Sequence, residues 1–260
     1  MIPKKIHFVF GLREDFGGKP WSLIHYLAVA SAKEINPSYE VMMHAKYEPK
    51  GNFWWDAIKP MVTMVPVDEV PMSIFGKPIK NHAHSADVLR LQAMQKYGGI
   101  YLDSDTICVR PFDPLLNHSF VMGVEKFEGH VNGLCNAVIM SEPGAPFLAH
   151  WYDAYREFNP DGWIEISVQK PMALATQFPE LIHIEPNESF FKFDWSQRHV
   201  AMLHSEVSDV SDCYSIHLWE TIVWREILSN LDPLKLLRTT TTYSTLARRH
   251  LHRFGSQVFS

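Results

Sequence analysis

Residues 85–105 constrain the fold of this chain more than any other part of its sequence. Ser85 is a suitable N-cap for a helix, and apolar residues follow it at helical spacing. Gly98 and Gly99 then predict a left-handed helix end, and the apolar run after them predicts a short strand that ends at Asp103. A capped helix followed directly by a buried strand is typical of the β-α-β units of α/β folds.

The same residues predict that four charged side chains meet at one edge of a sheet. In a β-α-β unit the helix begins at the edge where the strands end. We place Asp87 in the first helical turn, with Arg90 three residues later on the same face, and Asp103 and Asp105 leave the following strand nearby. Paired carboxylates suit a divalent cation such as Mn²⁺ or Mg²⁺, and the planar guanidinium of Arg90 suits a phosphate oxygen. We therefore expect a site for a metal and a diphosphate here.

Each of these signals has an ordinary structural explanation when it stands alone. An Asp-x-Asp pair often forms a turn or a helix cap, and Arg90 with Asp87 alone would be a surface pair worth about 0.2–0.5 kcal/mol. The succession of capped helix, glycine pair, apolar strand and paired aspartates favours a functional site. His82 and His84 flank the helix entry, but no third ligand matches them, so we expect them in a solvated loop.

The rest of the chain alternates strand and helix signals, which predicts an α/β fold with helices covering a sheet. Strands are expected at 6–10, 40–44, 120–124, 137–140 and 214–219. Helices are expected at 20–33, 146–157, 171–177 and 222–231. Irregular chain is expected at 51–80, and a glycine-rich loop at 129–136.

Composition excludes several classes of protein. The 260 residues, 46% hydrophobic and 20% charged, predict a single globular domain. The net charge of -5 lacks the excess of basic residues that is typical of nucleic-acid-binding proteins. Cys108, Cys135 and Cys213 form no disulfide or zinc pattern, which is typical of a reducing compartment. No signal-peptide pattern or apolar run of about 20 residues is found, so we expect a soluble cytoplasmic protein.

A basic run near the C-terminus departs from the acidic balance of the chain. It comprises Arg248, Arg249, His250, His252 and Arg253. We expect a solvated face of a terminal helix here, and weak peripheral contact with an anionic membrane surface or partner is the alternative.

The run A-D-V-L-R-L-Q-A-M-Q-K-Y-G-G-I-Y-L-D-S-D resembles the DXD-containing sugar-binding region of family 32-type glycosyltransferases. These include initiating mannosyltransferases, capsule and lipopolysaccharide enzymes and, more distantly, the glucosyltransferase domain of clostridial toxins. The match is dense over 85–114, weaker over 2–11 and scattered as far as Trp219. The resemblance implies a GT-A (Rossmann-like) fold with a mixed central sheet and helices on both faces. It also implies a nucleotide-sugar donor, Mn²⁺ or Mg²⁺, and retention of anomeric configuration.

The resemblance also implies roles for individual residues. Asp103 and Asp105 match the metal and donor carboxylates, with His217 as a further metal ligand. Asp87 matches the residue that accepts sugar hydroxyls, and Arg90 matches a phosphate or sugar contact. Further donor contacts are expected from Phe10, Gly11, Tyr101, Asn136 and Trp219.

Two positions depart from the family pattern. Lys170 replaces a glycine before the proline of a helix, which puts acceptor binding in doubt. Glu220-Thr221 follows the H-x-W run of His217 and Trp219, where relatives often have a Ser-Trp pair further on. The roles of His217 and Trp219 therefore depend on the resemblance, because alone they would be packing residues.

The resemblance implies a polysaccharide-type hexosyltransferase with a UDP-sugar or GDP-mannose donor and a glycan, lipid-linked or protein acceptor. Within a single domain, 1–115 would bind the nucleotide-sugar and metal, 116–235 the acceptor, and 236–260 would be a basic helical tail. No second carboxylate is evidently placed as a covalent nucleophile, so we expect front-face attack. An inactive sugar-nucleotide-binding scaffold is one alternative. An aspartyl-phosphate phosphatase is another, although Ile107 occupies the Thr position of its D-x-D-x-T motif.

Overall fold

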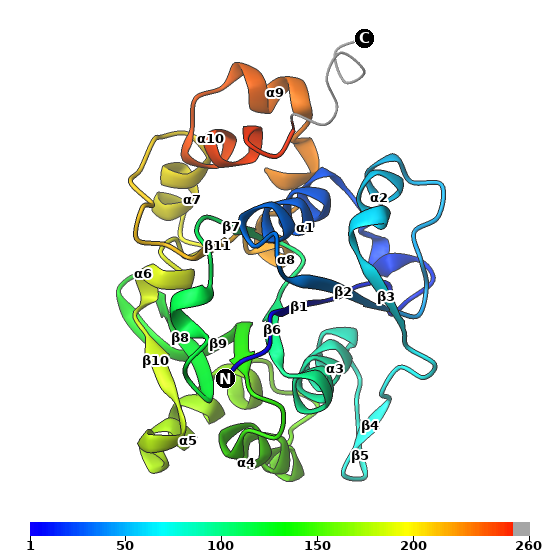
Figure 1. The fold of residues 1–260 in the computed structure, drawn as a ribbon, viewed down its shortest axis with the longest axis vertical. Helices are drawn as coiled ribbons and strands as arrows, with labels where there is room; N and C mark the ends of the chain where they lie inside the picture. The colour runs from blue at the N-terminus through cyan, green and yellow to red at the C-terminus, as the bar shows by residue number, and fades with distance from the viewer. Residues whose placement is uncertain (252–260) are drawn as a thin grey trace.

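The computed structural model describes residues 1–251 and centres on a seven-stranded mixed sheet (Figure 1). In spatial order the strands are β10 (His183–Glu185), β8 (Phe120–Phe127), β9 (His130–Ser141), β6 (Gly99–Leu102), β1 (Lys5–Val9), β2 (Glu40–Ala45) and β3 (Thr63–Pro66). Strands β6, β1, β2 and β3 are parallel, whereas β9 is antiparallel to both β6 and β8. The predicted α/β class is confirmed.

The strands separate two apolar cores, one on each face of the sheet. Ile100 and Leu102 of β6 pack in the core with α1 (Leu23–Ile35), whereas Tyr101 packs in the core with α3 (His82–Tyr97) and α4 (Pro146–Ala154). This division follows from the period of two along a strand. Helices on both faces are therefore confirmed as well.

Helix α3 begins earlier than the sequence predicts. The side-chain oxygen of Asn81 accepts the backbone N–H of Ala83 at 3.0 Å, so Asn81 is the N-cap. Ser85 lies inside the helix, where its hydroxyl donates to the carbonyl of Pro71 at 2.8 Å. The predicted cap at Ser85 is therefore wrong, and Asp87 lies in the second turn rather than the first.

The end of α3 is as predicted. Gly98 has φ of +59°, and its N–H donates to the carbonyl of Met94 at 2.9 Å. A Cβ at this position would lie 2.5 Å from Cδ of Pro143, so only glycine fits both the backbone and the space.

The first half of the chain largely follows its pattern. Strands β1 and β2 lie within one residue of their predicted bounds, and α1 starts after a capping box at Ser22. The segment 51–80, expected to be irregular, contains α2 (Phe53–Ile58), strand β3 and a small hairpin of β4 (Ser73–Ile74) and β5 (Lys77–Pro78).

The glycine-rich loop expected at 129–136 is mostly strand. Strands β8 and β9 form a long hairpin that turns at Glu128 and Gly129. The register shifts between Glu125 and Lys126, opposite Gly133, so this glycine marks a bulge rather than a loop.

The last third of the chain packs beside β7 (Thr106–Cys108), which pairs antiparallel with β11 (Ser215–His217). Its helices are α5 (Lys170–Gln177), α6 (Asn187–Phe190), α7 (Gln197–His204), α8 (Glu220–Val223), α9 (Pro233–Arg238) and α10 (Thr242–Arg248). The helix expected at 222–231 is wrong in its extent, since α8 ends at Val223 and only a 3₁₀ turn, Leu228–Asn230, follows it.

The basic C-terminal run is only partly a solvated face. His250 is buried, and its Nδ1 lies 2.7 Å from Oε2 of Glu34, because α10 packs against the α1 side of the molecule. His252 and Arg253 lie outside the described residues. Within residues 1–251, no helix has the length and apolarity needed to cross a bilayer.

Candidate active site

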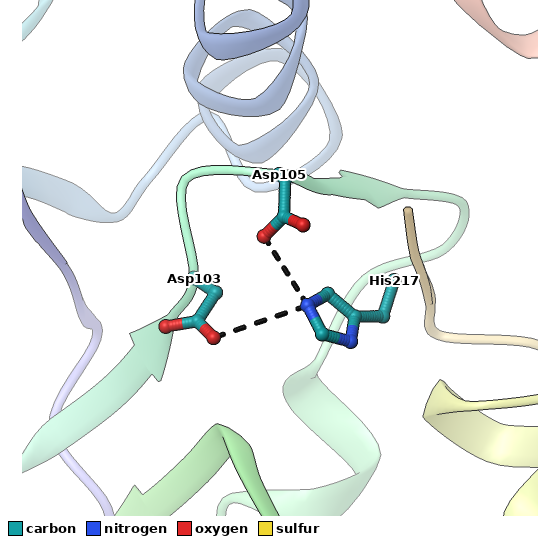
Figure 2. A group of neighbouring side chains, drawn as sticks. All are labelled: Asp103, Asp105 and His217. Atoms are coloured by element: carbon teal, nitrogen blue, oxygen red, sulfur yellow. Dashed lines mark ion pairs between the residues drawn. The ribbon is translucent and has the colours of Figure 1, made fainter. Parts of the chain in front are cut away.

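Three predicted metal ligands converge from separate elements (Figure 2). Asp103 follows β6, Asp105 precedes β7, and His217 ends β11. Nε2 of His217 lies 3.2 Å from Oδ1 of Asp105 and 3.9 Å from Oδ2 of Asp103. One ligand atom from each residue lies within 4.8 Å of the others. Two carboxylates and one imidazole suit a divalent cation such as Mn²⁺.

Asp105 ties this cluster to the C-terminal part of the chain. Its Oδ2 accepts the backbone N–H of Glu220 at 2.7 Å, and its carbonyl accepts the N–H of Leu218 at 2.9 Å. Burial would raise the pKa of Asp105, but the opposing charge and hydrogen bond of His217 lower it to about 2. Burial likewise would lower the pKa of His217, but Asp105 outweighs burial and raises it. The two side chains therefore stabilise each other across their 3.2 Å contact.

Asp103 joins a second group of predicted residues. Its Oδ1 accepts from the Tyr101 hydroxyl at 2.6 Å and lies 3.1 Å from Nη1 of Arg90. Arg90 also lies 3.2 Å from Oδ1 of Asp87 and donates to the carbonyl of Asn136 at 2.8 Å. The Asn136 amide donates to Asp87 at 2.7 Å. The structure thus brings five predicted residues into one hydrogen-bonded network. One of them, Asp103, also belongs to the candidate metal ligands Asp103, Asp105 and His217, which we call the metal cluster.

Asp87 is buried within this network at the wall of an adjacent cavity. Burial raises its pKa, although Arg90 opposes the change. A carboxylate in this state is held in place by its partners and presents its remaining acceptor capacity to the adjacent cavity.

The cavity beside these residues has a volume of about 470 Å³. It is lined by eight of the predicted residues: Asp87, Arg90, Tyr101, Asp103, Asp105, Asn136, His217 and Trp219. This volume lies in the usual range for a small-molecule site.

Phe10 and Gly11 are the predicted residues that the structure does not bring to the cavity. Val9 lines it instead. The Phe10 ring stacks on Phe16 at 5.6 Å and meets the edge of Trp21 at 4.9 Å, because apolar neighbours surround the end of β1.

Trp219 lines the cavity in an unusual backbone conformation. Its φ of 56° is left-handed, which is rare for a bulky residue. Its indole N–H donates to the carbonyl of Phe193 at 2.7 Å. Its ring centroid lies 4.2 Å from that of His217 and 4.6 Å from that of Trp195. These contacts hold the ring beside His217 and offset the cost of the backbone.

The cavity also includes residues that the sequence analysis missed. Glu125 is 3% exposed and its carboxylate accepts from the Asn132 amide at 3.1 Å. His84, expected in a solvated loop, is 3% exposed because α3 begins before it and turns it toward the cavity. Trp163 and Glu220 line the cavity too. None of these residues stands in a local motif, so only tertiary structure reveals them.

Comparison with known proteins identifies the class to which the site belongs. Residues 25–121 match the family described as "Glycosyltransferase sugar-binding region containing DXD motif". Glucan organizing enzyme 1 of Cryptococcus neoformans var. grubii is 33% identical over 260 residues, covering 95% of this chain and 70% of that protein. The chain belongs to this family of DXD-containing glycosyltransferases, and it is an enzyme of that class.

Two more similarities are narrower or more distant. Inositol phosphoceramide mannosyltransferase 3 of Schizosaccharomyces pombe is 42% identical over 64 residues, covering 24% of this chain and 17% of that protein. The crystal structure of apo-form GlyE from Streptococcus pneumoniae TIGR4 has a TM-score of 0.55 at 12% identity, covering 98% of this chain and 64% of that one. The fold is therefore that of GT-A glycosyltransferases, as expected.

Proposed function

We propose that the protein transfers a hexose from a nucleotide-sugar, with a UDP-sugar favoured over GDP-mannose, to a hydroxyl acceptor with retention of configuration. The observation that carries this proposal is the convergence of Asp103, Asp105 and His217 beside a cavity that Asp87 and Arg90 also line. A divalent cation there would neutralise charge on the departing diphosphate. Mn²⁺ is the favoured ion, with Mg²⁺ as the alternative.

The chain's own residues would orient the donor sugar. Asp87 accepts a hydrogen bond from Asn136 and retains acceptor capacity for sugar hydroxyls. Arg90 is shared between Asp87 and Asp103, so we assign it to positioning both carboxylates as well as to contact with phosphate or sugar. Tyr101 would hold Asp103 through its hydroxyl. Trp219 and Trp195 would exclude water above the diphosphate.

We also propose front-face attack, in which the leaving phosphate takes the acceptor proton. Glu125 is a buried carboxylate of the cavity that belongs neither to the group of Asp103, Asp105 and His217 nor to the network of Asp87 and Arg90. Its hydrogen bond from Asn132 supports a positioning role. A covalent glycosyl intermediate on Glu125 is the competing mechanism.

A thermal-shift screen of UDP- and GDP-sugars, with and without Mn²⁺, tests the proposal. Donor binding at a hundredfold excess over Kd should stabilise the protein by about 2.7 kcal/mol, and only when the metal is present. The rate at which nucleotide is released in the presence of an acceptor then measures transfer. Metal-independent binding would contradict the assignment of the carboxylates. Binding without turnover across many acceptors would support the inactive scaffold, whereas membership of a glycosyltransferase family argues against the phosphatase.

A further inference from the structure

Three polar side chains recur along one face of α3 and line the cavity: His84, Asp87 and Arg90. Arg90 marks the end near the metal cluster, since it contacts Asp103 at 3.1 Å. A helix rises about 1.5 Å per residue, so His84 lies about 9 Å further along the axis than Arg90. His84 therefore lies beyond the stretch that the network of Asp87 and Arg90 serves.

His84 has no hydrogen-bond partner in the described part of the chain. Both of its ring nitrogens are buried, and neither meets a donor or acceptor among residues 1–251. Its ring neighbours are aromatic, with Phe158 at 5.1 Å in an edge contact and Trp163 at 5.7 Å. A buried polar group left in this state costs about 1–3 kcal/mol, so a ligand hydroxyl would remove a real penalty.

Trp163 adds a flat apolar surface at the same end of the cavity. Its side chain is 52% exposed although it lines the cavity. Its backbone is held on both sides, because its N–H donates to Glu165 at 2.6 Å and its carbonyl accepts from Ser167 at 3.3 Å. An open indole on an anchored backbone suits a ligand with one apolar face and a polar rim.

The segment after Trp163 supports this interpretation independently. Residues Glu165–Gln169 form a π-helical turn, a rare conformation that is frequent at functional sites. The turn packs onto Gly133 of β9 so closely that a Cβ there would lie 2.3 Å from the carbonyl oxygen of Val168. The sheet thus sets the position of the segment that carries Trp163.

We propose that Trp163 and His84 form an acceptor subsite for a sugar ring, so that the acceptor is a glycan or glycoside. The ring would stack on the indole while its hydroxyls bond to the imidazole. This inference rests on the proposed function, because it places the acceptor beyond the donor held by Asp87 and Arg90.

Ligand-observed saturation-transfer NMR tests the subsite directly. The probes are methyl α-glucoside, methyl α-mannoside and a Ser/Thr peptide, each measured with and without UDP and Mn²⁺. We expect saturation of the ring protons of at least one glycoside with the wild-type protein. Trp163→Ala and His84→Ala should each weaken its Kd about fivefold or more, with partial rescue in His84→Gln. Phe53→Ala is the matched control, since Phe53 is 55% exposed on α2 and does not line the cavity.

The donor thermal shift, measured in each variant, separates this inference from the proposed function. Glycoside binding that Trp163→Ala leaves unchanged would overturn the subsite, and so would no glycoside binding in a protein that still binds donor with Mn²⁺. Peptide binding lost in Trp163→Ala, with no glycoside bound, would assign a protein acceptor and also overturn it. Failure of every donor to bind would count against the proposed function instead, while the glycoside result obtained without UDP stands by itself.

Discussion

Asp105 is buried more deeply than Asp103. It faces His217 and accepts the N–H of Glu220, whereas a quarter of the Asp103 side chain is exposed. Asp105→Asn should therefore abolish metal-dependent donor binding and lower transfer by about 100-fold or more. Nucleotide release during Mn²⁺ titration measures both effects. Asp113→Asn is the control, since Asp113 is an exposed carboxylate paired with Lys4 outside the site. Unchanged activity in Asp105→Asn would refute the metal assignment.

A buried histidine pair lies away from the site, under α3. Nδ1 of His7 contacts Nε2 of His44 at 2.9 Å, and Nε2 of His7 donates to the carbonyl of Gly98. Burial, the larger cause, and repulsion from His44, the smaller one, lower the pKa of His7 to about 3. Burial and Lys96 lower the pKa of His44 to about 4. Both rings are therefore neutral in the folded protein, but they gain protons below about pH 6.5 when unfolded.

The free energy of unfolding that the two neutral rings contribute is therefore fully present above about pH 6.5. It is lost progressively as the pH falls through the folded-state pKa values of about 4 for His44 and about 3 for His7. Each proton adds a slope of up to about 1.4 kcal/mol per pH unit. We expect His44→Gln to lower Tm at pH 7 and to flatten the fall of Tm between pH 7 and 4. Circular dichroism melts measure both. Exposed His130 gives the control His130→Gln, and a wild-type slope in His44→Gln would contradict the assignment.

Glu125 distinguishes the two mechanisms proposed for transfer with retention. A glutamine there can still accept from Asn132, so front-face attack predicts a loss of no more than about tenfold in Glu125→Gln, with the product anomer unchanged. Product analysis by NMR checks this, with exposed Glu128→Gln as the control. A loss above about 1,000-fold in Glu125→Gln, with release of nucleotide diphosphate and formation of a glycosyl azide of inverted configuration when azide is added to Glu125→Ala, would identify Glu125 as the nucleophile.

Among the elements, the π-helical turn Glu165–Gln169 depends on one glycine of β9. In Gly133→Ala the new methyl group would overlap the carbonyl of Val168, so we expect a loss of about 1–3 kcal/mol in stability and a displaced Trp163. Urea unfolding measures the first effect and glycoside binding the second. Gly144→Ala is the control, because Gly144 has φ of +70° with open space around it, and it reports the backbone cost alone. Wild-type values for Gly133→Ala would show that the turn adjusts freely.

Elements with strong local patterns were predictable, and those set by tertiary contacts were not. The apolar runs of β1, β2 and β6 identify buried strands, and Gly98 identifies the end of α3. Asn81 and Ser85 are both good caps, however, and the choice depends on a contact between Ser85 and distant Pro71. The segment 129–136 carries Gly129 in the hairpin turn and Gly133 at the bulge of β9, and both also suit a loop, so the local pattern gave a wrong prediction there.

The same distinction applies to the site. Asp87, Arg90, Tyr101 and Asp103 come from one continuous stretch, so local spacing was enough to bring them together. His217 needed the family resemblance, because 112 residues separate it from Asp105. Glu125, Trp163 and the orientation of His84 depend on packing between elements and carry no local signal.

For the whole molecule, we propose one domain in which 1–115, 116–235 and 236–251 fold together. Two cores share the strands of one sheet, so neither core keeps its shape when the other unfolds. We expect a single cooperative transition, with tryptophan fluorescence and far-UV circular dichroism coinciding in urea. Buried Trp21 and Trp55 report on one core and Trp151 on the other. Two separate transitions would show that the two cores unfold independently and would contradict the single domain.

The pairing of β7 with β11 also has a consequence for synthesis of the chain. Asp105 and Glu220 are 115 residues apart, yet they share a hydrogen bond at the cavity. Both carboxylates of the DXD motif leave the ribosome long before the segment that carries His217. A nascent chain that already contains Asp103 and Asp105 still lacks the imidazole of His217 and the indole of Trp219. The proposed metal site is therefore completed only after β11 has been synthesised, and a shorter nascent polypeptide would not consume donor.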